Sequence, residues 1–255
     1  RDRSYDLKDC LEKLPRTSID RLCLPHVYFM APSIIVVHDK IKETTRLCIP
    51  ERNLAGRNNL GNDLDSFKRI ISGRPPEYGN FRGDAGGFKS NFTQAGYMNA
   101  IKKIKEYIAA GDIYQVNMSQ RFEMDVQGDT FSLFKTLYHN NPAPFFAYIH
   151  AGNHYIVSTS PERFLLQTGQ HVETRPIKGT RPRGKTPVED KKLRRELKQS
   201  KKDDAELSMI VDLLRNDIGK VCRVGSVRVM KHKRLEAYQN VYHLVSIVEG
   251  RLAQG

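Results

Sequence analysis

The sequence of 255 residues contains no tryptophan and no apolar run near the roughly 20 residues that a membrane-spanning helix needs. Its first residues, RDRSYDLKDC, are too polar for a secretory signal peptide, so we expect a cytoplasmic protein that does not enter a membrane. The cysteines are few, widely spaced and without a Cys-x-x-Cys pair. This pattern disfavours a zinc site or a disulfide framework and predicts four reduced thiols, at Cys10, Cys23, Cys48 and Cys222.

Several common catalytic motifs are also missing. The sequence has no G-x-x-x-x-G-K-[ST] phosphate loop, no G-x-G-x-x-G turn, no G-x-S-x-G elbow and no H-E-x-x-H pair. Nucleotide hydrolysis, dinucleotide chemistry and zinc proteolysis therefore have little support.

The formal charge of +13 raises the question of nucleic-acid binding. Most of the excess lies between residues 178 and 202, which hold 11 Lys or Arg and three acids, a net of +8. No aromatic residue lies in this stretch to stack on bases, as single-strand binders require. We interpret it as a loop and a solvated helix face and expect no nucleic-acid partner, although its field favours an anionic substrate.

The first 90 residues carry few regular patterns. SIIVVHD (33–39) is a short run rich in β-branched residues and predicts a strand. Residues 51–92 show no clear period and contain many Gly, Pro and Asn, which is typical of a linker or surface loop. We place a domain boundary near residue 90, giving domains 1–90 and 91–255.

Helices and hairpins alternate after this boundary. A helix is expected at 93–110, between the N-cap Thr93 and the stop Gly111, and a one-sided strand at 113–126, where apolar residues alternate. A short helix, TFSLFKTLYHN, follows. FFAYIH and HYIVSTS flank Ala-Gly-Asn, and RFLLQ and HVETRP flank Thr-Gly-Gln, so both pairs predict hairpins.

Two further helices are expected at about 188–200 and 203–218, followed by a strand in VGSVRVMKH and a mixed segment through HLVSIVEG. This order predicts an α+β fold on antiparallel sheets.

The helix at 203–218 places carboxylates among apolar residues. Glu206 falls between Leu213 and Ile210 on the helical wheel, and Asp217 lies in the same arc, although near the helix end it can be exposed. A carboxylate that faces a core is costly unless it is paired, metal-bound or protonated. Glu206 is thus a candidate for metal ligation or catalysis. The alternative is a buried bridge to an arginine, with Arg163, Arg175 and Arg215 as possible partners.

Three other residues could carry chemistry. Glu162, in SPERF, is either a solvated loop carboxylate or a functional acid. Lys178, in RPIKGT, belongs to a basic loop, where partial burial and neighbouring cations would lower the pKa of its amine and make it nucleophilic, while Gly179 leaves room for a ligand. His243 lies among apolar residues and is either a satisfied core histidine or a catalyst.

Seven strings, in this order and spacing, together resemble the chorismate-binding enzymes: IYQVNMSQRF, NPAPFFAYI, SPERF, RPIKGTRPR, DDAELSMIVDLLRNDIGKV, GSVRV and YHLVS, over residues 113–246. The family includes anthranilate synthase component I, aminodeoxychorismate synthase component I, isochorismate synthase and salicylate synthase. The resemblance implies a two-layer sandwich of antiparallel sheets with helices outside. Residues 1–90 then correspond to the later part of a small N-terminal domain plus linker.

Lys178 points within the family to aminodeoxychorismate synthase component I, which has P-I-K-G-T where anthranilate synthases usually have P-I-A-G-T. The resemblance implies that Lys178 adds to C2 of chorismate and that Glu162 is the general acid. It also implies that His243 lies near the ring, that Gly179 and Thr180 contact substrate, and that Glu206 is a Mg²⁺ ligand. The ammonia would come from a glutamine amidotransferase, as a subunit or a fused domain.

The sequence departs from the family pattern at its ends. Residues 1–255 do not include the family's opening strands or its later Gly-Ala-Pro-Lys turn and paired glutamates. We therefore expect a fragment that is nearly inactive alone. The alternatives are an anthranilate synthase or another chorismate enzyme, against which Lys178 argues, and a degenerate, non-catalytic binding protein.

Overall fold

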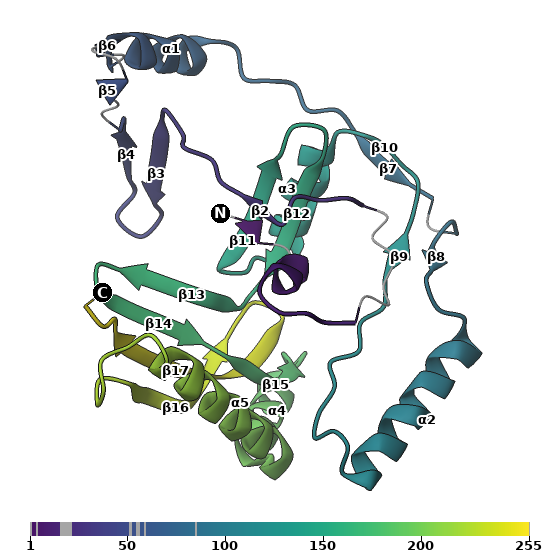
Figure 1. Cartoon of the computed structure of the whole chain (residues 1–255). Coiled ribbons are helices and arrows are strands. Elements are labelled where there is room, and N and C mark those ends of the chain that lie inside the picture. The colour runs from purple at the N-terminus through teal and green to yellow at the C-terminus, as the bar shows by residue number, and fades with distance from the viewer. Residues whose placement is uncertain are drawn as a thin grey trace. The chain divides into compact units, whose positions relative to one another are not determined.

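The computed structural model describes residues 2–3, 5–15, 22–50, 53–54, 57–58, 60–84 and 86–254 (Figure 1). They divide into two compact units, residues 1–77 and 78–255. The division falls before residue 90 because the short strands β7 (Phe81–Gly83) and β8 (Lys89–Ser90) pair with β10 (Val126–Gly128) and β9 (Phe122–Glu123) of the second unit. The assignment of the units to the two family domains stays a prediction.

The first unit consists of small, separate elements. Strand β1 (Asp2–Arg3) pairs with β2 (Val27–Tyr28), a 3-10 helix spans Tyr5–Cys10, and β5 (Asn53–Leu54) pairs with β6 (Arg57–Asn58). The predicted strand at 33–39 is confirmed as β3 (Ile35–Asp39), which forms a hairpin with β4 (Thr44–Cys48). Asp39 closes this hairpin, because its Oδ1 accepts hydrogen bonds from the backbone N–H groups of Ile41 and Lys42.

The prediction of a linker or surface loop at 51–92 is wrong for its middle part. Helix α1 (Leu60–Ser72) occupies it. The helix has no buried residue, and its Ile70 and Ile71 are exposed. Apolar residues at Leu60, Leu64, Phe67 and Ile71 recur at helical spacing, and the surrounding Gly- and Pro-rich pieces masked this pattern.

In the second unit, helix α2 (Gln94–Ala110) is confirmed with both predicted ends. The Thr93 hydroxyl accepts a hydrogen bond from the Gly96 N–H at 3.0 Å, and Gly111 adopts φ +83° beyond the last turn. The expected strand at 113–126 is wrong. Only β9 and the start of β10 are paired there, so the alternating residues before Phe122 have no neighbouring strand in the described part of the chain.

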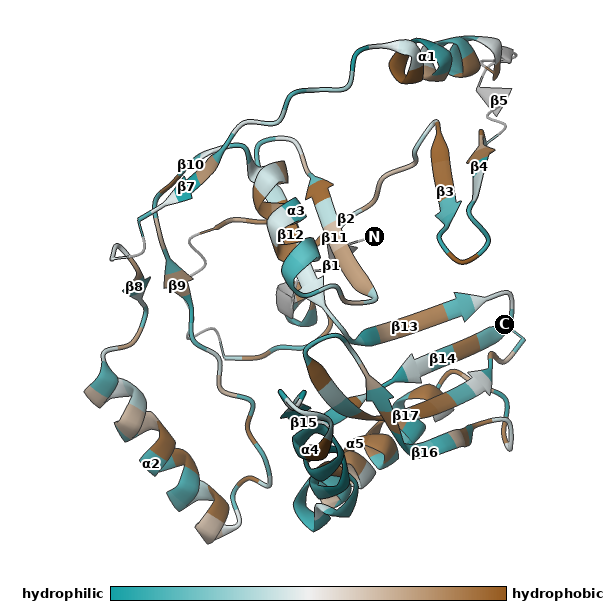
Figure 2. Ribbon diagram, turned by 180° about the vertical axis from the view of Figure 1, so that it is seen from behind, coloured by the Kyte–Doolittle hydropathy of each residue, from teal (hydrophilic) through white to brown (hydrophobic). Residues whose placement is uncertain are grey.

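The predicted helix TFSLFKTLYHN is α3 (Thr130–Asn140), and the first predicted hairpin is β11 (Phe145–His150) with β12 (Tyr155–Ser160). Rings of the helix stack against rings of the hairpin: Phe131 contacts Tyr148, and Phe134 contacts Phe146, with centroids 5.1 and 6.0 Å apart. Figure 2 shows the apolar colouring of this hairpin.

The largest sheet is built around one long strand, β17 (Val241–Arg251). On one side it pairs with β16 (Arg228–Ala237). This is the strand expected in VGSVRVMKH, but it begins and ends later in the sequence. On the other side β17 pairs with β14 (His171–Arg175) and, after Pro176, with β15 (Ile177–Pro182). Strand β13 (Arg163–Thr168) completes the second predicted hairpin with β14. Every pairing is antiparallel, which agrees with the predicted α+β class.

Helices α4 (Pro187–Gln199) and α5 (Lys201–Gly219) pack on β15 and β17. Ser200 ends α4 and caps α5, accepting a hydrogen bond from the Asp203 N–H at 3.3 Å. The core lies between the helices and the sheet and contains Leu197, Leu207, Val211, Ile218, Cys222, Tyr242, Leu244 and Val248. Because alternate residues of β17 enter this core, the remaining residues, including His243, face the opposite side of the sheet.

Candidate active site on strands β15 and β17

Three predicted site residues lie on adjacent rungs of the paired strands β15 and β17. Lys178 lies opposite Leu244, and Thr180 lies opposite His243. Because cross-strand partners share a face of the sheet, Lys178 shares the face of Leu244 and Thr180 shares the face of His243. Between these two rungs the register shifts, because Gly179 is an extra residue in β15. Lys178 is half-buried, while Thr180 is exposed.

Gly179 is required by its backbone and by its neighbours. Its φ is +76°, which residues with a side chain rarely adopt. A Cβ at this position would lie 2.8 Å from Cβ of Asp203 and 3.0 Å from Cδ1 of Leu197. The expectation that Gly179 leaves room for a ligand is thus corrected on this side, since the free space is filled by helices α4 and α5. Its contact with substrate stays a prediction.

Glu162 lies in the turn between β12 and β13 and is exposed. Its own N–H donates to the Ser160 hydroxyl at 3.2 Å. Its Oε1 accepts a hydrogen bond from the Ile177 N–H at 2.8 Å. This bond ties the carboxylate to the residue before Lys178, so two residues that are 16 positions apart in the sequence become neighbours.

His243 is buried, with 8% of its surface exposed. Its Nδ1 lies 2.9 Å from the Thr180 hydroxyl. Burial lowers the pKa of His243 below its ordinary 6.5, and a hydrogen bond to the Gly179 backbone and the charges of Glu162 and Glu236 offset only part of this effect. The imidazole is therefore neutral at neutral pH.

A second charged group, missed in the sequence, lies beside these residues. Glu173 of β14 is buried and binds two arginines: Arg175 at 2.8 and 3.2 Å, and Arg163. A buried Arg–carboxylate bridge was expected, but with Glu206 as its acid. The signal was present in the hairpin pattern, because Glu173 and Arg175 alternate onto one face of β14.

A small cavity of about 90 Å³ separates this charge group from the residues around His243. Pro161 and Ile177 line it beside the Glu162 turn, and Arg163 and Arg175 line it beside Glu173. Glu236 and Tyr238 line it near His243. The cavity is therefore lined by neighbours of Glu162 and of His243, although neither of these two residues lines it.

The expectation that Glu206 faces the core is wrong. Its side chain is 38% exposed and lies 3.7 Å from the Lys202 ammonium one turn earlier. The buried acid of α5 is Asp203, which accepts a hydrogen bond from Arg181 at 3.1 Å. The apolar arc is thus centred on Asp203, Leu207 and Val211, whereas Leu213 on its far side is 55% exposed. Asp217 is exposed, as allowed for at the helix end.

A Mg²⁺ site is not completed by the residues that the structure describes. Within them, no three His, Cys, Asp or Glu side chains are grouped closely enough to hold a metal ion. Mg²⁺ prefers six oxygen ligands, of which Glu206 can supply one or two. Glu206 as a Mg²⁺ ligand stays a prediction, and no chemical step below depends on it.

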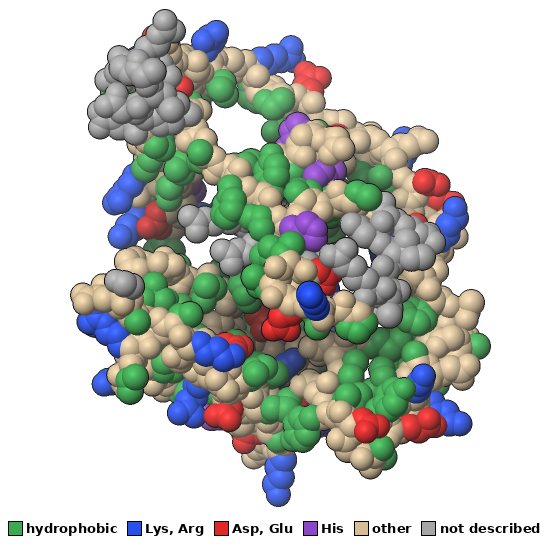
Figure 3. All heavy atoms as spheres, in the orientation of Figure 1, with side chains coloured by type: hydrophobic (Ala, Val, Ile, Leu, Met, Phe, Trp, Pro, Cys, Tyr) green, Lys and Arg blue, Asp and Glu red, His purple; other side chains and the backbone are tan. Residues whose placement is uncertain are grey.

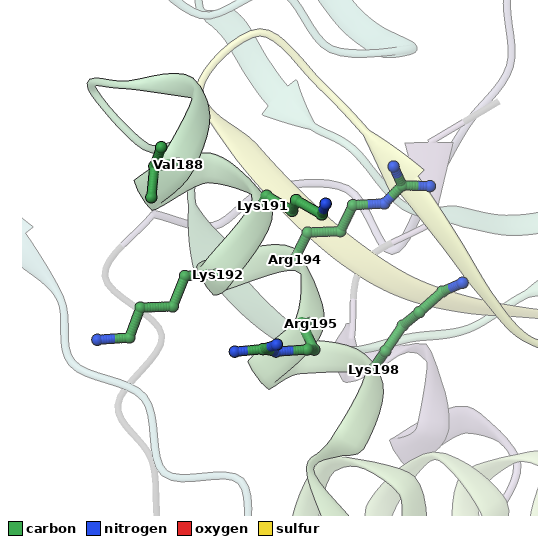
Figure 4. A pocket seen from close by; sticks show the side chains of 6 residues that line it. All are labelled: Val188, Lys191, Lys192, Arg194, Arg195 and Lys198. Atoms are coloured by element: carbon green, nitrogen blue, oxygen red, sulfur yellow. The ribbon is translucent and has the colours of Figure 1, made fainter.

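The basic stretch forms one face of helix α4. Lys191, Lys192, Arg194, Arg195 and Lys198 surround a hollow of about 560 Å³ with Val188 (Figure 4). Only Lys192 among them has a carboxylate within ion-pair distance in the described chain, Glu196 at 3.9 Å. None of the predicted catalytic residues lines this hollow. That this helix face is only solvated, as the sequence analysis expects, stays a prediction.

The model of the family described as chorismate binding enzyme matches residues 3–255. The chain belongs to the chorismate-binding enzyme family. This confirms the resemblance given by the seven strings, and residues 162, 178, 179, 180, 206 and 243 all fall within the matched range.

Several chorismate-binding enzymes are similar over nearly the whole chain. Anthranilate synthase component 1 of Thermus thermophilus is 39% identical over 99% of this chain and 54% of its own length. Aminodeoxychorismate synthase component 1 of Bacillus subtilis is 38% identical, also over 99% of this chain and 54% of its own length. The crystal structure of anthranilate synthase component I from Streptococcus pneumoniae matches with a TM-score of 0.85 at 28% identity, over 98% of this chain and 56% of that one. The chain thus spans about half the length of these curated relatives.

This solved structure confirms the predicted fold class of helices on antiparallel sheets, since the match covers 98% of this chain. Apolar side chains are nevertheless widely spread over the visible face in Figure 3. Phe164 and Leu165 of β13 are among the exposed apolar residues of the chain. No helix in the described ranges is long and apolar enough to cross a membrane. The described cysteines form no disulfide with one another, and Cys222 is the buried one among them.

Proposed function

We propose that the protein containing this chain aminates chorismate at C4, giving 4-amino-4-deoxychorismate for 4-aminobenzoate and folate synthesis. The observation that carries the proposal is a lysine, Lys178, held one rung from the His243–Thr180 pair and one residue from the anchor of Glu162. An alanine at position 178 could not form a covalent bond with the substrate.

In the proposed mechanism the Lys178 amine adds to C2 of the chorismate ring while the bond from C4 to its hydroxyl breaks. Glu162, as general acid, donates the proton with which the hydroxyl leaves as water. Ammonia then adds at C4 and the bond between C2 and the lysine nitrogen breaks, which restores the free amine. The net reaction consumes chorismate and ammonia and releases aminodeoxychorismate and water.

His243 and the α4–α5 layer support this chemistry in different ways. In the proposed mechanism the neutral imidazole of His243 would take up the proton released when ammonia adds to the ring. Asp203 and Leu197 pack against Gly179 and so fix the backbone next to Lys178. The family resemblance adds Mg²⁺, which would bind the ring carboxylate, and a glutamine amidotransferase, as a subunit or fused domain, which would supply the ammonia.

A second candidate is anthranilate synthesis, in which ammonia attacks C2 directly. The relatives favour neither reaction, because proteins of both names are similar to nearly the same degree. The third candidate, a non-catalytic protein that binds chorismate, is disfavoured because Lys178, Glu162 and His243 are all present.

Product analysis distinguishes these candidates. The protein, as this chain and within its natural gene product, would be incubated with chorismate, Mg²⁺ and ammonium at alkaline pH, and products identified by chromatography and mass. We expect aminodeoxychorismate from the gene product and little turnover from the isolated chain. Anthranilate as the product would overturn the proposal, and chorismate binding without turnover by the gene product would favour the binding protein.

A further inference from the structure

The turn between β16 and β17 folds a tyrosine back onto the predicted active-site histidine. The Tyr238 N–H donates to the Val241 carbonyl at 2.8 Å, which closes the turn. The Tyr238 ring then meets the His243 ring edge to face, with centroids 5.3 Å apart and planes at 65°. An aromatic pair in this arrangement has a preferred orientation, so the tyrosine restricts how the imidazole can rotate.

The tyrosine is itself held by Glu236. Its hydroxyl donates to Glu236 Oε2 at 2.9 Å, and burial, followed by this hydrogen bond, raises the pKa of Tyr238 to about 12. The hydroxyl therefore stays protonated and donates throughout the neutral range. Glu236 lies directly opposite His243 in the β16–β17 register, and its side chain is 19% exposed and 3.5 Å from Arg234.

The other edge of His243 is fixed by the Thr180 hydroxyl at Nδ1. The imidazole thus contacts the Tyr238 ring and is hydrogen-bonded at one nitrogen to Thr180. The charged groups that act on it are the carboxylates of Glu162 and Glu236.

We propose that Glu236 and Tyr238 act as a positioning pair, which fixes the ring orientation and the electrostatic environment of His243 for proton transfer. Neither residue touches the reacting atoms in this role. The proposal deepens the proposed function, since its kinetic consequence rests on the chorismate reaction, but the geometry of His243 can be measured without any turnover.

The test combines Tyr238→Phe, which keeps the ring and removes the hydroxyl, with Glu236→Gln, which keeps the shape and removes the charge. Tyr155→Phe is the matched control, because Tyr155 is 48% exposed and lies in a hairpin away from β17. The nitrogen-15 shifts of His243 would be followed against pH by NMR in each protein. Turnover of chorismate with ammonium would be measured on the gene product.

The two variants should move the pKa of His243 in opposite directions. Tyr238→Phe leaves the Glu236 charge without its hydrogen-bond donor and should raise the pKa, whereas Glu236→Gln removes a favourable charge and should lower it. Both should reduce kcat by about 10-fold with little change in KM, within the range of effects on positioned proton-transfer groups. Tyr155→Phe should change neither quantity.

Unchanged His243 shifts and pKa in both folded variants would overturn the proposal, even if their Tm fell, because a pair that only packs would affect stability alone. Should Tyr238→Phe fail to fold, Glu236→Gln decides the question by the same criterion. A wild-type protein that makes no aminodeoxychorismate would contradict the proposed function, while the His243 shifts would still report on the positioning pair.

Discussion

The buried group of Glu173, Arg163 and Arg175 allows a quantitative prediction for Glu173→Gln. The substitution keeps the size of the side chain and removes the charge that two guanidinium groups share. The Glu173 side chain is 10% exposed, whereas the side chains of Arg163 and Arg175 are 23% and 35% exposed. Loss of one partner costs roughly 3–5 kcal/mol in a buried pair and roughly 0–1 kcal/mol in an exposed one, so we expect about 2–3 kcal/mol here.

This loss should appear in the unfolding of the protein by heat and by urea at neutral pH. For a chain of this size it corresponds to a decrease in Tm of about 4–12 °C. Glu196→Gln on α4 is the matched control, because Glu196 is 45% exposed and its ion pair with Lys192 is 3.9 Å long. The control should change the free energy of unfolding by less than about 0.5 kcal/mol.

The pH dependence supplies a second check. Burial raises the pKa of Glu173, but the hydrogen bonds from Arg175 and Arg163 lower it by more, so its pKa lies below the ordinary 4.5. The stabilisation is therefore complete above pH 4.5 and is lost as the pH falls through the lowered pKa. The difference between wild type and Glu173→Gln should shrink over that interval. A variant as stable as the control at neutral pH, or a difference that grows on acidification, would refute this reasoning.

Three further predictions concern the sheet and its helices. Gly179→Ala should lower the free energy of unfolding by about 2–4 kcal/mol, because it adds a side-chain clash to a positive φ. The control Gly152→Ala, at φ +79° with open space around it, should cost roughly 1–2 kcal/mol. Equal losses in urea unfolding would contradict the packing argument. Leu207→Ala should cost about 2–5 kcal/mol because Leu207 is fully buried, and Leu213→Ala on the exposed side of α5 less than about 1 kcal/mol; the reverse order in thermal melts would place the helix face wrongly. As the pH falls below 6.5, His243 takes up a proton in the unfolded chain before it does so in the folded protein, because folding lowers its pKa. Wild-type stability should therefore decline until the lowered pKa is reached. A His243→Gln variant with the same slope of stability against pH would count against a buried neutral imidazole.

Local signals in the sequence were sufficient for most elements of the second unit. Thr93 and Gly111 bound a helix because a hydroxyl can cap its first turn and a glycine can adopt the positive φ that ends it. The turns at Ala-Gly-Asn and Thr-Gly-Gln each join two strands of six or five residues. Such signals act within a few residues and need no knowledge of the remaining fold.

Features that depend on distant partners were missed. The alternation at 113–126 is compatible with a strand, but a strand also needs a neighbour for its backbone groups. The helical wheel of α5 correctly predicts that Leu207 and Val211 are buried. It does not show on which side of these residues the buried face extends, so it places Glu206 inside and misses Asp203. Which edge is buried is decided by Gly179 and Arg181 on β15, which no pattern within the helix reveals.

The candidate site shows the same division. Glu162, Lys178, Thr180 and His243 were chosen mainly by family resemblance, and the structure brings them to one pair of strands and the adjacent turn. The contacts of Glu236 and Tyr238 with His243 were not predicted, because they arise only when β16 pairs with β17.

The most direct test of the central claim is the fate of Lys178. The gene product would be compared with Lys178→Ala and with Lys185→Ala, a control lysine on the exposed loop before α4, in chorismate and ammonium. Peptide mass spectrometry after rapid quenching would search for a dehydrated chorismate adduct. The account predicts an adduct at position 178, unchanged turnover in Lys185→Ala, and a fall of about 100-fold or more in aminodeoxychorismate formation for Lys178→Ala. Formation of aminodeoxychorismate at the wild-type rate by Lys178→Ala would contradict it.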